Sequence, residues 1–259
     1  MKVIKLILFI LSPAIFLFVS PAFILLLIKK PSNNREWELG QNKLASIVFD
    51  NDNQCKVKIN NFRNFDWCKN QTNRWCTKDI DIKDITGLDV AVTHFGHIGH
   101  IFLIFNLINK KSVGVSIEAR RDGGERFTIF GGLKFDYELI YIYADKQDLI
   151  DLRKKRNEKM YIYKTRMKAK TAQALFISFA HRTNKIHKEP EFYHLFFRNC
   201  ANLITNELKR VTNKKFSFVD TYFFLPSVAS RTLFNMGFIK TDKDNFKDVQ
   251  KESLVRFDN

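Results

Sequence analysis

Apolar and polar residues change their spacing several times along this chain, and each spacing predicts a different element. Residues 6–28 form an uncharged apolar run of 23 residues. A helix of that length spans roughly 34 Å, which is enough to cross a bilayer. Lys29, Lys30 and Pro31 follow the run, and no small-residue cleavage site appears. We therefore expect residues 1–30 to be an uncleaved N-terminal transmembrane helix.

Short apolar or alternating runs predict strands. Residues 101–105 are apolar throughout and indicate a buried strand, whereas residues 113–119 alternate apolar and polar positions. A turn between the two runs predicts a hairpin, with Ser116 and Glu118 facing away from its valines. The polar, Asn-rich stretch 66–83 predicts a loop. Further strands are expected at residues 47–49, 57–59, 88–92, 137–143 and 161–164.

Helical spacing is found mainly in the second half of the chain. Residues 170–183 place apolar side chains at i, i+3, i+4 and i+7, and residues 201–211 repeat that spacing. Shorter helices are expected at 146–156 and 229–236. The combination predicts an α+β domain over residues 45–259. Residues 31–44 are polar and lightly charged and are expected to be a linker.

Cys200 is expected to be the first residue of the helix that includes residues 201–211, because Asn199 is a favoured N-cap residue. The positive end of the helix dipole would lower the pKa of the thiol and favour the nucleophilic thiolate. The free N–H groups of the first helical turn could also hold a developing oxyanion. The alternative is that Cys200 is a small apolar residue buried at a helix start.

His100 is the candidate partner for this thiol. It closes a run that also holds His94 and His97, but two glycines and the lack of a carboxylate argue against a metal site there. A histidine within hydrogen-bond reach of an activated thiol serves as a general base. Glu118 could orient the imidazole, or could instead form a surface ion pair with a neighbouring arginine.

The formal net charge of +16 indicates an anionic partner. The basic residues are spread along the chain without a long basic run, so we expect no nucleic-acid partner and assign the charge to an anionic membrane surface. Lysines flank the apolar run on both sides, so charge alone does not decide its orientation. Cys55, Cys68 and Cys76 cluster in a polar segment, and a disulfide between two of them would suit an oxidising compartment.

Several ordered motifs resemble the family of the Lnb N-terminal periplasmic domain, most clearly over residues 58–240. They are NFRNF at 61–65, HIFL at 100–103, SIEARR at 116–121, YELIY at 137–141, DLIDLR at 148–153, PEFY at 190–193 and RNC at 198–200. The resemblance implies a circularly permuted papain-like domain of the NlpC type, built on an antiparallel sheet, in which a strand histidine precedes the nucleophilic cysteine. His100 and Cys200 occur in that order.

The resemblance also implies an activity. Proteins of this family are associated with bacterial lipoprotein N-acylation, so Cys200 would take a fatty acyl chain from a membrane phospholipid and pass it to a lipoprotein N-terminus, without metal or organic cofactor. His100 would be the base and Glu118 its orienting carboxylate, with Asn199, Arg198 and Tyr193 as substrate-binding or oxyanion residues.

The expected location is the bacterial inner membrane, as a single-pass protein whose soluble domain faces the periplasm. Family acyltransferases carry further membrane helices after this domain, which a partner membrane protein could supply here. Two alternatives stay open, because a fold does not fix a function. One is a papain-like peptidase, amidase or other thiol hydrolase of the cell envelope. The other is a non-catalytic binding module tethered to the membrane.

Overall fold

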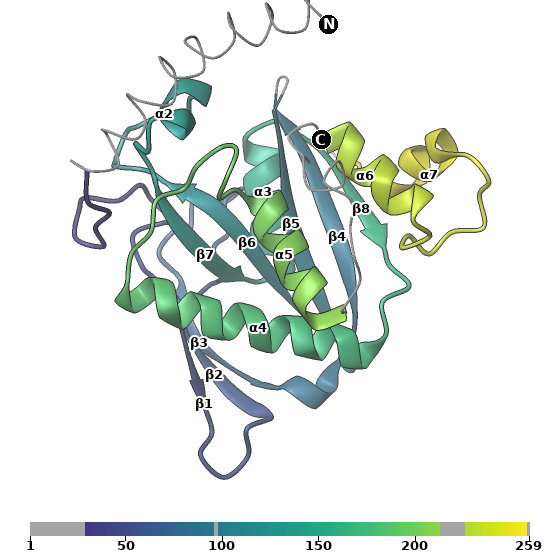
Figure 1. Ribbon diagram of the computed structural model, residues 1–259, viewed down its shortest axis with the longest axis horizontal. Helices are drawn as coiled ribbons and strands as arrows, with labels where there is room; N and C mark the ends of the chain where they lie inside the picture. The colour runs from purple at the N-terminus through teal and green to yellow at the C-terminus, as the bar shows by residue number, and fades with distance from the viewer. Residues whose placement is uncertain (1–28, 96–97, 213–225, 258–259) are drawn as a thin grey trace, which may run out of the picture.

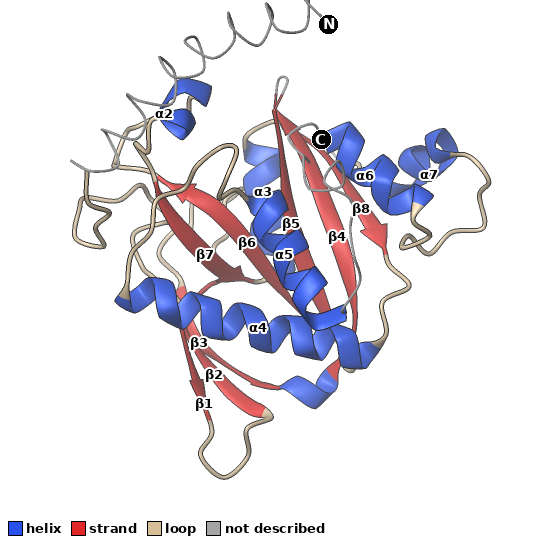
Figure 2. Ribbon diagram, in the orientation of Figure 1, coloured by secondary structure: helices blue, strands red, loops and turns tan. Residues whose placement is uncertain are grey.

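The predicted strands come together as one mixed sheet in the computed structural model, which describes residues 29–95, 98–212 and 226–257 (Figure 2). The strand order is β1-β2-β7-β6-β5-β4-β8, and β3 pairs with the free side of β2. The strands are β1 (Ser46–Phe49), β2 (Lys56–Arg63), β3 (Trp75–Asp81), β4 (Ile85–Phe95), β5 (Ile98–Leu107), β6 (Ser112–Arg120), β7 (Glu138–Ala144) and β8 (Lys159–Lys164).

Helices cover both faces of the sheet (Figure 1). The described helices are α2 (Ile129–Leu133), α3 (Lys146–Lys155), α4 (Ala169–Lys188), α5 (Cys200–Thr212), α6 (Pro226–Asn235) and α7 (Phe246–Ser253), with a 3₁₀ turn at Ile82–Asp84. The helices α4 and α5 lie across one face, and α3 packs against the other. The α+β class predicted from the sequence is confirmed.

The expectation of an antiparallel sheet needs one correction. All neighbouring strands pair antiparallel except β2 and β7, which meet in parallel at Arg63 and Ala144. The junction forms where β7 ends and the chain turns into α3, since the N–H of Asp145 donates to the carbonyl of Arg63. The predicted hairpin between β5 and β6 is confirmed, with Phe102 opposite Ser116.

The run of apolar residues in β5 is explained by burial on both faces. Ile101, Leu103 and Phe105 pack with α4 and α5, whereas Phe102 and Ile104 pack with Leu149 of α3. Side chains alternate across a strand, so a strand covered on both faces needs an apolar residue at nearly every position. His100 lies on the Phe102 side, and the two rings stack with centroids 6.1 Å apart.

Two parts of the fold differ from the sequence prediction. The stretch expected to be a loop contains β3, a polar edge strand that pairs only with β2 and therefore needs few apolar residues. The short helices α2 and α7 were not predicted. The four cysteines are unpaired in the described structure, so the disulfide considered among Cys55, Cys68 and Cys76 is absent there.

The predicted anchor at residues 6–28 lies outside the described residues. Within the parts of the chain that the structure describes, no helix combines the length and apolarity needed to span a bilayer.

A buried ion pair joins the parallel junction to α3. Arg63 and Asp148 are each 1% exposed, and the Arg63 Nε lies 2.9 Å from an Asp148 carboxylate oxygen. The same carboxylate accepts hydrogen bonds from the backbone N–H of Phe65 and the indole of Trp67. The carbonyl of Gly40 accepts from Arg63 Nη1. Together these bonds satisfy a charge that the core would otherwise exclude.

We predict that Asp148→Ala destabilises the domain by about 3–5 kcal/mol, because it leaves the Arg63 guanidinium buried without its counter-charge. The matched control is Asp151→Ala on the same helix, whose carboxylate pairs with Gln147 at the surface. The control should change stability by less than about 0.5 kcal/mol. Urea unfolding of the full chain in detergent micelles, followed by tryptophan fluorescence, measures both. Equal effects would contradict the role given to the buried pair.

Candidate active site

A cleft of about 330 Å³ opens where the start of β5, the middle of β6 and the start of α5 converge. His100, Glu118, Tyr193 and Cys200, all proposed from the sequence, line this one cleft. The rest of its wall carries three arginines, Arg121, Arg153 and Arg156, and one further carboxylate, Glu158, which pairs with Arg153 and Arg156. The cleft therefore brings together a thiol, an imidazole and a carboxylate from segments far apart in the sequence.

Cys200 begins α5 as predicted, and the helix start is closely capped. The Asn199 side-chain oxygen accepts from the N–H of Asn202 at 2.9 Å, and the Asn202 side chain accepts from the N–H of Asn199 at 2.8 Å. This reciprocal arrangement is the asparagine counterpart of a capping box. It fixes the direction in which the first helical residue presents its side chain.

The expectation that Cys200 has a lowered pKa is wrong for this structure. The thiol is only 7% exposed, and burial raises its pKa to about 11. Backbone hydrogen bonds from Ile101 and Ala201 act in the opposite direction but are weaker than the burial effect. The sulfur therefore rests as a neutral thiol. The sulfur is hydrogen-bonded to the backbone of Ile101, which directly follows His100 on β5.

His100 reaches Glu118 through an intermediate hydroxyl. The imidazole Nε2 lies 2.8 Å from Ser116 Oγ, and that hydroxyl donates to Glu118 Oε1 at 2.8 Å. The direct distance from Nε2 to Glu118 Oε1 is 3.8 Å. Glu118 is thus connected to His100 through Ser116, and its role in orienting the imidazole stays a prediction. The alternation of the strand placed Ser116 on the same face as Glu118, but it assigned no role to the serine.

This chain of bonds decides which imidazole nitrogen is free. A hydroxyl has one hydrogen to donate, and that of Ser116 goes to Glu118. Nε2 of His100 must therefore carry its own hydrogen and donate it to Ser116, which leaves Nδ1 with the lone pair. Burial and the nearby Arg153 lower the pKa of His100 to about 3, so the ring is neutral at physiological pH. Within the described residues, no hydrogen bond joins it to the thiol.

Glu118 is held as a buried carboxylate, 9% exposed, and does not form the surface ion pair considered from the sequence. Arg153 lies 3.0 Å from Oε1, and the Gln41 side-chain amide donates to Oε2 at 3.1 Å. Burial alone would raise the pKa of Glu118, but Arg153, with His100 and Arg63, brings it well below its usual range. The carboxylate is therefore ionised and ready to accept from Ser116.

The three residues assigned to substrate or oxyanion binding have different surroundings. Tyr193 lines the cleft and is 7% exposed, and burial beside Cys200 raises its pKa well above the usual range. Asn199 instead caps α5, and its amide group donates to the carbonyl of Leu195. Arg198 contacts Glu191 and the carbonyl of Phe192. The structure thus places only Tyr193 in the cleft.

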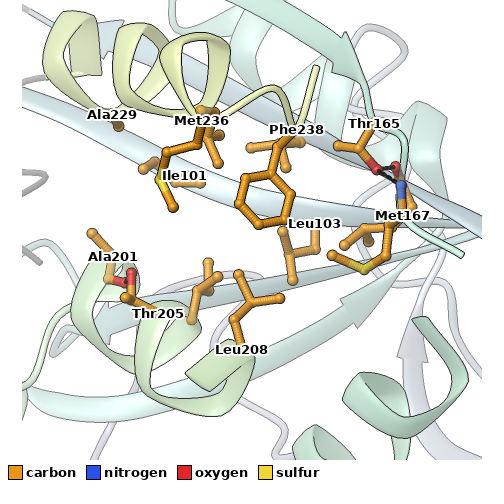
Figure 3. Close-up of a pocket in the computed structure, with 14 residues that line it drawn as sticks. Ile101, Leu103, Thr165, Met167, Ala201, Thr205, Leu208, Ala229, Met236 and Phe238 are labelled. Atoms are coloured by element: carbon orange, nitrogen blue, oxygen red, sulfur yellow. Dashed lines mark hydrogen bonds between the residues drawn. The ribbon is translucent and has the colours of Figure 1, made fainter. Parts of the chain in front are cut away.

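A second, smaller cavity lies behind α5, between that helix, β4, β5 and α6 (Figure 3). Its lining is apolar and includes Ala201, the neighbour of Cys200, together with Leu103 and Leu208. Its volume of about 40 Å³ holds roughly one water-sized group. In this form the cavity does not accommodate a long chain.

One group of potential metal ligands occurs among the described residues. Asp66, Cys68 and Asp151 bring one ligand atom each within 4.8 Å of the others. None of the three lines the cleft. Acidic side chains gather at protein surfaces in this way without an ion, so the group gives no reason to place a metal in the active site.

The fold and the cleft define an α+β domain with a cysteine and a histidine at a common site. A family model for the Lnb N-terminal periplasmic domain matches residues 71–235, more than half of the chain. The chain belongs to this family, and the match supports a domain that faces the periplasm. No curated protein and no solved structure matches the chain.

We predict that Cys200 reacts slowly with iodoacetamide at neutral pH and that its rate rises about tenfold per pH unit between pH 7 and 10, because only the thiolate reacts and the pKa is about 11. The measurement uses the full chain carrying Cys55→Ser, Cys68→Ser and Cys76→Ser, so that one thiol remains. A plateau in rate near pH 7 would show instead that the thiolate is already formed.

Proposed function

We propose that this protein is a membrane-anchored cysteine acyltransferase that moves a fatty acyl chain from a phospholipid, through a thioester on Cys200, to the N-terminal amine of a lipoprotein. The observation that carries the proposal is the shared cleft, in which Cys200 at a capped helix start meets a His100–Ser116–Glu118 chain. Nucleophile, base and orienting groups are the parts that covalent acyl transfer requires.

In the first half of the reaction the acyl chain moves to the enzyme. The Cys200 proton passes to Nδ1 of His100 as the sulfur attacks the ester carbonyl of the phospholipid. The backbone N–H of Cys200 donates to the oxyanion of the tetrahedral intermediate. The carbon–oxygen bond then breaks, and His100 returns the proton to the leaving lysophospholipid alcohol. The acyl group remains on sulfur as a thioester.

In the second half an amine replaces the thiolate. The α-amine of a diacylglyceryl-modified cysteine attacks the thioester, and His100 accepts the amine proton. The carbon–sulfur bond breaks, an amide forms, and the proton restores the thiol of Cys200. Both half-reactions use the same base, and neither consumes an oxidant, a reductant or a metal. Arg121 and Arg156 on the cleft wall supply positive charge that suits the phosphate of the donor.

We also infer the architecture and location expected from the sequence. A strand histidine that precedes a helix-start cysteine, on a largely antiparallel sheet, suits the permuted papain-like arrangement of the NlpC type. Residues 1–30 anchor the chain in the bacterial inner membrane by a single helix, with the domain on the periplasmic side. There both the donor phospholipid and the acceptor lipoprotein are at hand, and a partner membrane protein completes the membrane part.

We predict a fatty-acyl mass increment on the full chain purified in phospholipid micelles. Hydroxylamine should remove it, because it cleaves thioesters, and Cys200→Ala should lack it. In His100→Ala the increment should form about 10²–10⁴ times more slowly, the usual contribution of a general base. Intact-mass spectrometry measures all three proteins. Adding a diacylated lipopeptide should move the increment from the protein to the peptide amine.

The outcomes separate the candidate functions. An increment that is lost to water but never passed to the lipopeptide would indicate a hydrolase. Cleavage of cell-wall peptides without any acyl increment would indicate a peptidase or amidase. If no increment forms and Cys200→Ser keeps the full biological function of the protein, the non-catalytic binding module is the remaining candidate. Slow alkylation is not diagnostic, because the raised pKa of Cys200 predicts it for the acyltransferase as well.

We predict that Ser116→Ala slows thioester formation by about 10²-fold, because Nε2 of His100 loses the acceptor that fixes its tautomer. Ser116→Thr keeps the hydroxyl and should recover most of the rate. Ser178→Ala, which removes another buried hydroxyl distant from the cleft, serves as the control for general destabilisation. Equal rates for Ser116→Ala and wild type would remove Ser116 from the mechanism.

A further inference from the structure

Four large apolar side chains are exposed beside the cleft, and we call them the aromatic patch. Ile129 and Phe130 belong to α2 and are 50% and 63% exposed. Phe196 and Phe197 belong to the segment before α5 and are 46% and 78% exposed. Scattered exposed apolar residues are ordinary, but a contiguous group marks an interaction surface.

The two segments that carry the patch are joined directly. The N–H of Leu195 donates to the carbonyl of Gly132 at 2.9 Å, which ties the second segment to α2. The ring of Phe135, just beyond α2, lies 4.6 Å from the ring of His194. The exposed residues of both segments therefore lie on one continuous part of the surface.

The exposure of Phe196 and Phe197 is built into the fold. His194 is 4% exposed, and its Nδ1 accepts from the N–H groups of both phenylalanines. His194 and Arg198 exchange two backbone hydrogen bonds, which close the turn between them. The ring of Phe197 stacks on that of His194 with centroids 4.6 Å apart. A turn fixed in this way presents its aromatic rings at little cost in conformational entropy.

Positive charge borders the patch. The Lys134 ammonium lies 3.7 Å from the centre of the Phe130 ring. Lys29 pairs with Asp136. The surface hollow beside this pair balances three basic side chains against three acidic ones (Lys29, Lys30 and Arg35; Asp122, Glu125 and Asp136), so the unbalanced positive charge at the patch is that of Lys134. Aromatic rings bordered by lysines match the boundary of an anionic bilayer, where rings enter the acyl region and ammonium groups stay among the headgroups.

The position of the apolar run in the chain indicates that a lipid bilayer contacts the aromatic patch. Lys29 directly follows the 23-residue apolar run and contacts the residues just after α2. A chain that leaves a bilayer at Lys29 therefore leaves it next to the patch. On the other side, Phe127 and Tyr193, which line the cleft, precede the two patch segments by a few residues. The patch thus lies between the entry of the anchor and the mouth of the cleft.

We propose that the aromatic patch inserts into the outer boundary of an anionic phospholipid bilayer and seats the cleft on the membrane surface. The inference rests on the membrane attachment in the proposed function but not on its chemistry. A bound bilayer would bring the ester groups of its lipids to the level of the cleft mouth, so that a donor need not leave the membrane to reach Cys200.

The test uses the full chain reconstituted in vesicles of phosphatidylglycerol and phosphatidylethanolamine, with and without brominated acyl chains, which quench tryptophan on contact. Phe197→Trp and Phe130→Trp report on the patch. Ile108→Trp is the matched control, since Ile108 is 60% exposed but follows the far end of β5, about 26 Å along the strand from His100. Wild type gives the emission of Trp37, Trp67 and Trp75.

We expect the added emission of Phe197→Trp and Phe130→Trp to shift to the blue and to be quenched at least about twofold more than that of Ile108→Trp. Quenching equal to the control would overturn the proposal and would leave the patch to a protein partner. This result does not depend on acyl transfer. If both proposals hold, Phe196→Ser with Phe197→Ser slows thioester formation from vesicle lipid but not from a water-soluble short-chain ester.

Discussion

The buried ion pair between Arg153 and Glu118 fixes the carboxylate on which the histidine side of the candidate active site depends. Arg153 is 2% exposed and Glu118 9%, and each charge stabilises the other, with Glu158 as a second partner of Arg153. Asp148, five residues before Arg153 on α3, pairs in the same way with Arg63 of β2. One helix is thus held in register against two strands at once, and the Glu118 carboxylate is fixed where the Ser116 hydroxyl and then the His100 imidazole can bond to it.

Local signals in the sequence predicted some of this arrangement. The start of α5 follows from Asn199 and the helical spacing after it, and the β5–β6 hairpin follows from alternation around a short turn. The contacts that complete the site are long-range, since Gln41 and Arg153 meet Glu118 from 77 and 35 positions away. No periodicity encodes such pairs. The pKa of Cys200 was mispredicted for the same reason, because the helix dipole is a local property and burial is set by the whole fold.

In the resting site the Cys200 thiol and the His100 imidazole are both neutral. With the pKa of Cys200 raised to about 11 and that of His100 lowered to about 3, an ion pair between them is disfavoured in the cleft. In the proposed reaction, proton transfer would accompany attack of the sulfur on the carbonyl carbon, when the negative charge passes to an oxyanion held by the backbone N–H of Cys200. The fold would contribute to that step by fixing the orientation of the His100 ring, because the Ser116 hydroxyl holds Nε2 and so leaves Nδ1 as the free nitrogen.

Because Cys200 is buried and protonated, its sulfur is also protected from oxidation. Oxidation of a cysteine to sulfenic acid proceeds through the thiolate and requires access by the oxidant. Cys200 is buried and protonated, whereas Cys68 and Cys76 are exposed. In a compartment that oxidises thiols, the two exposed cysteines would be consumed first, and the sulfur at the start of α5 would keep its reduced form for as long as the domain stays folded.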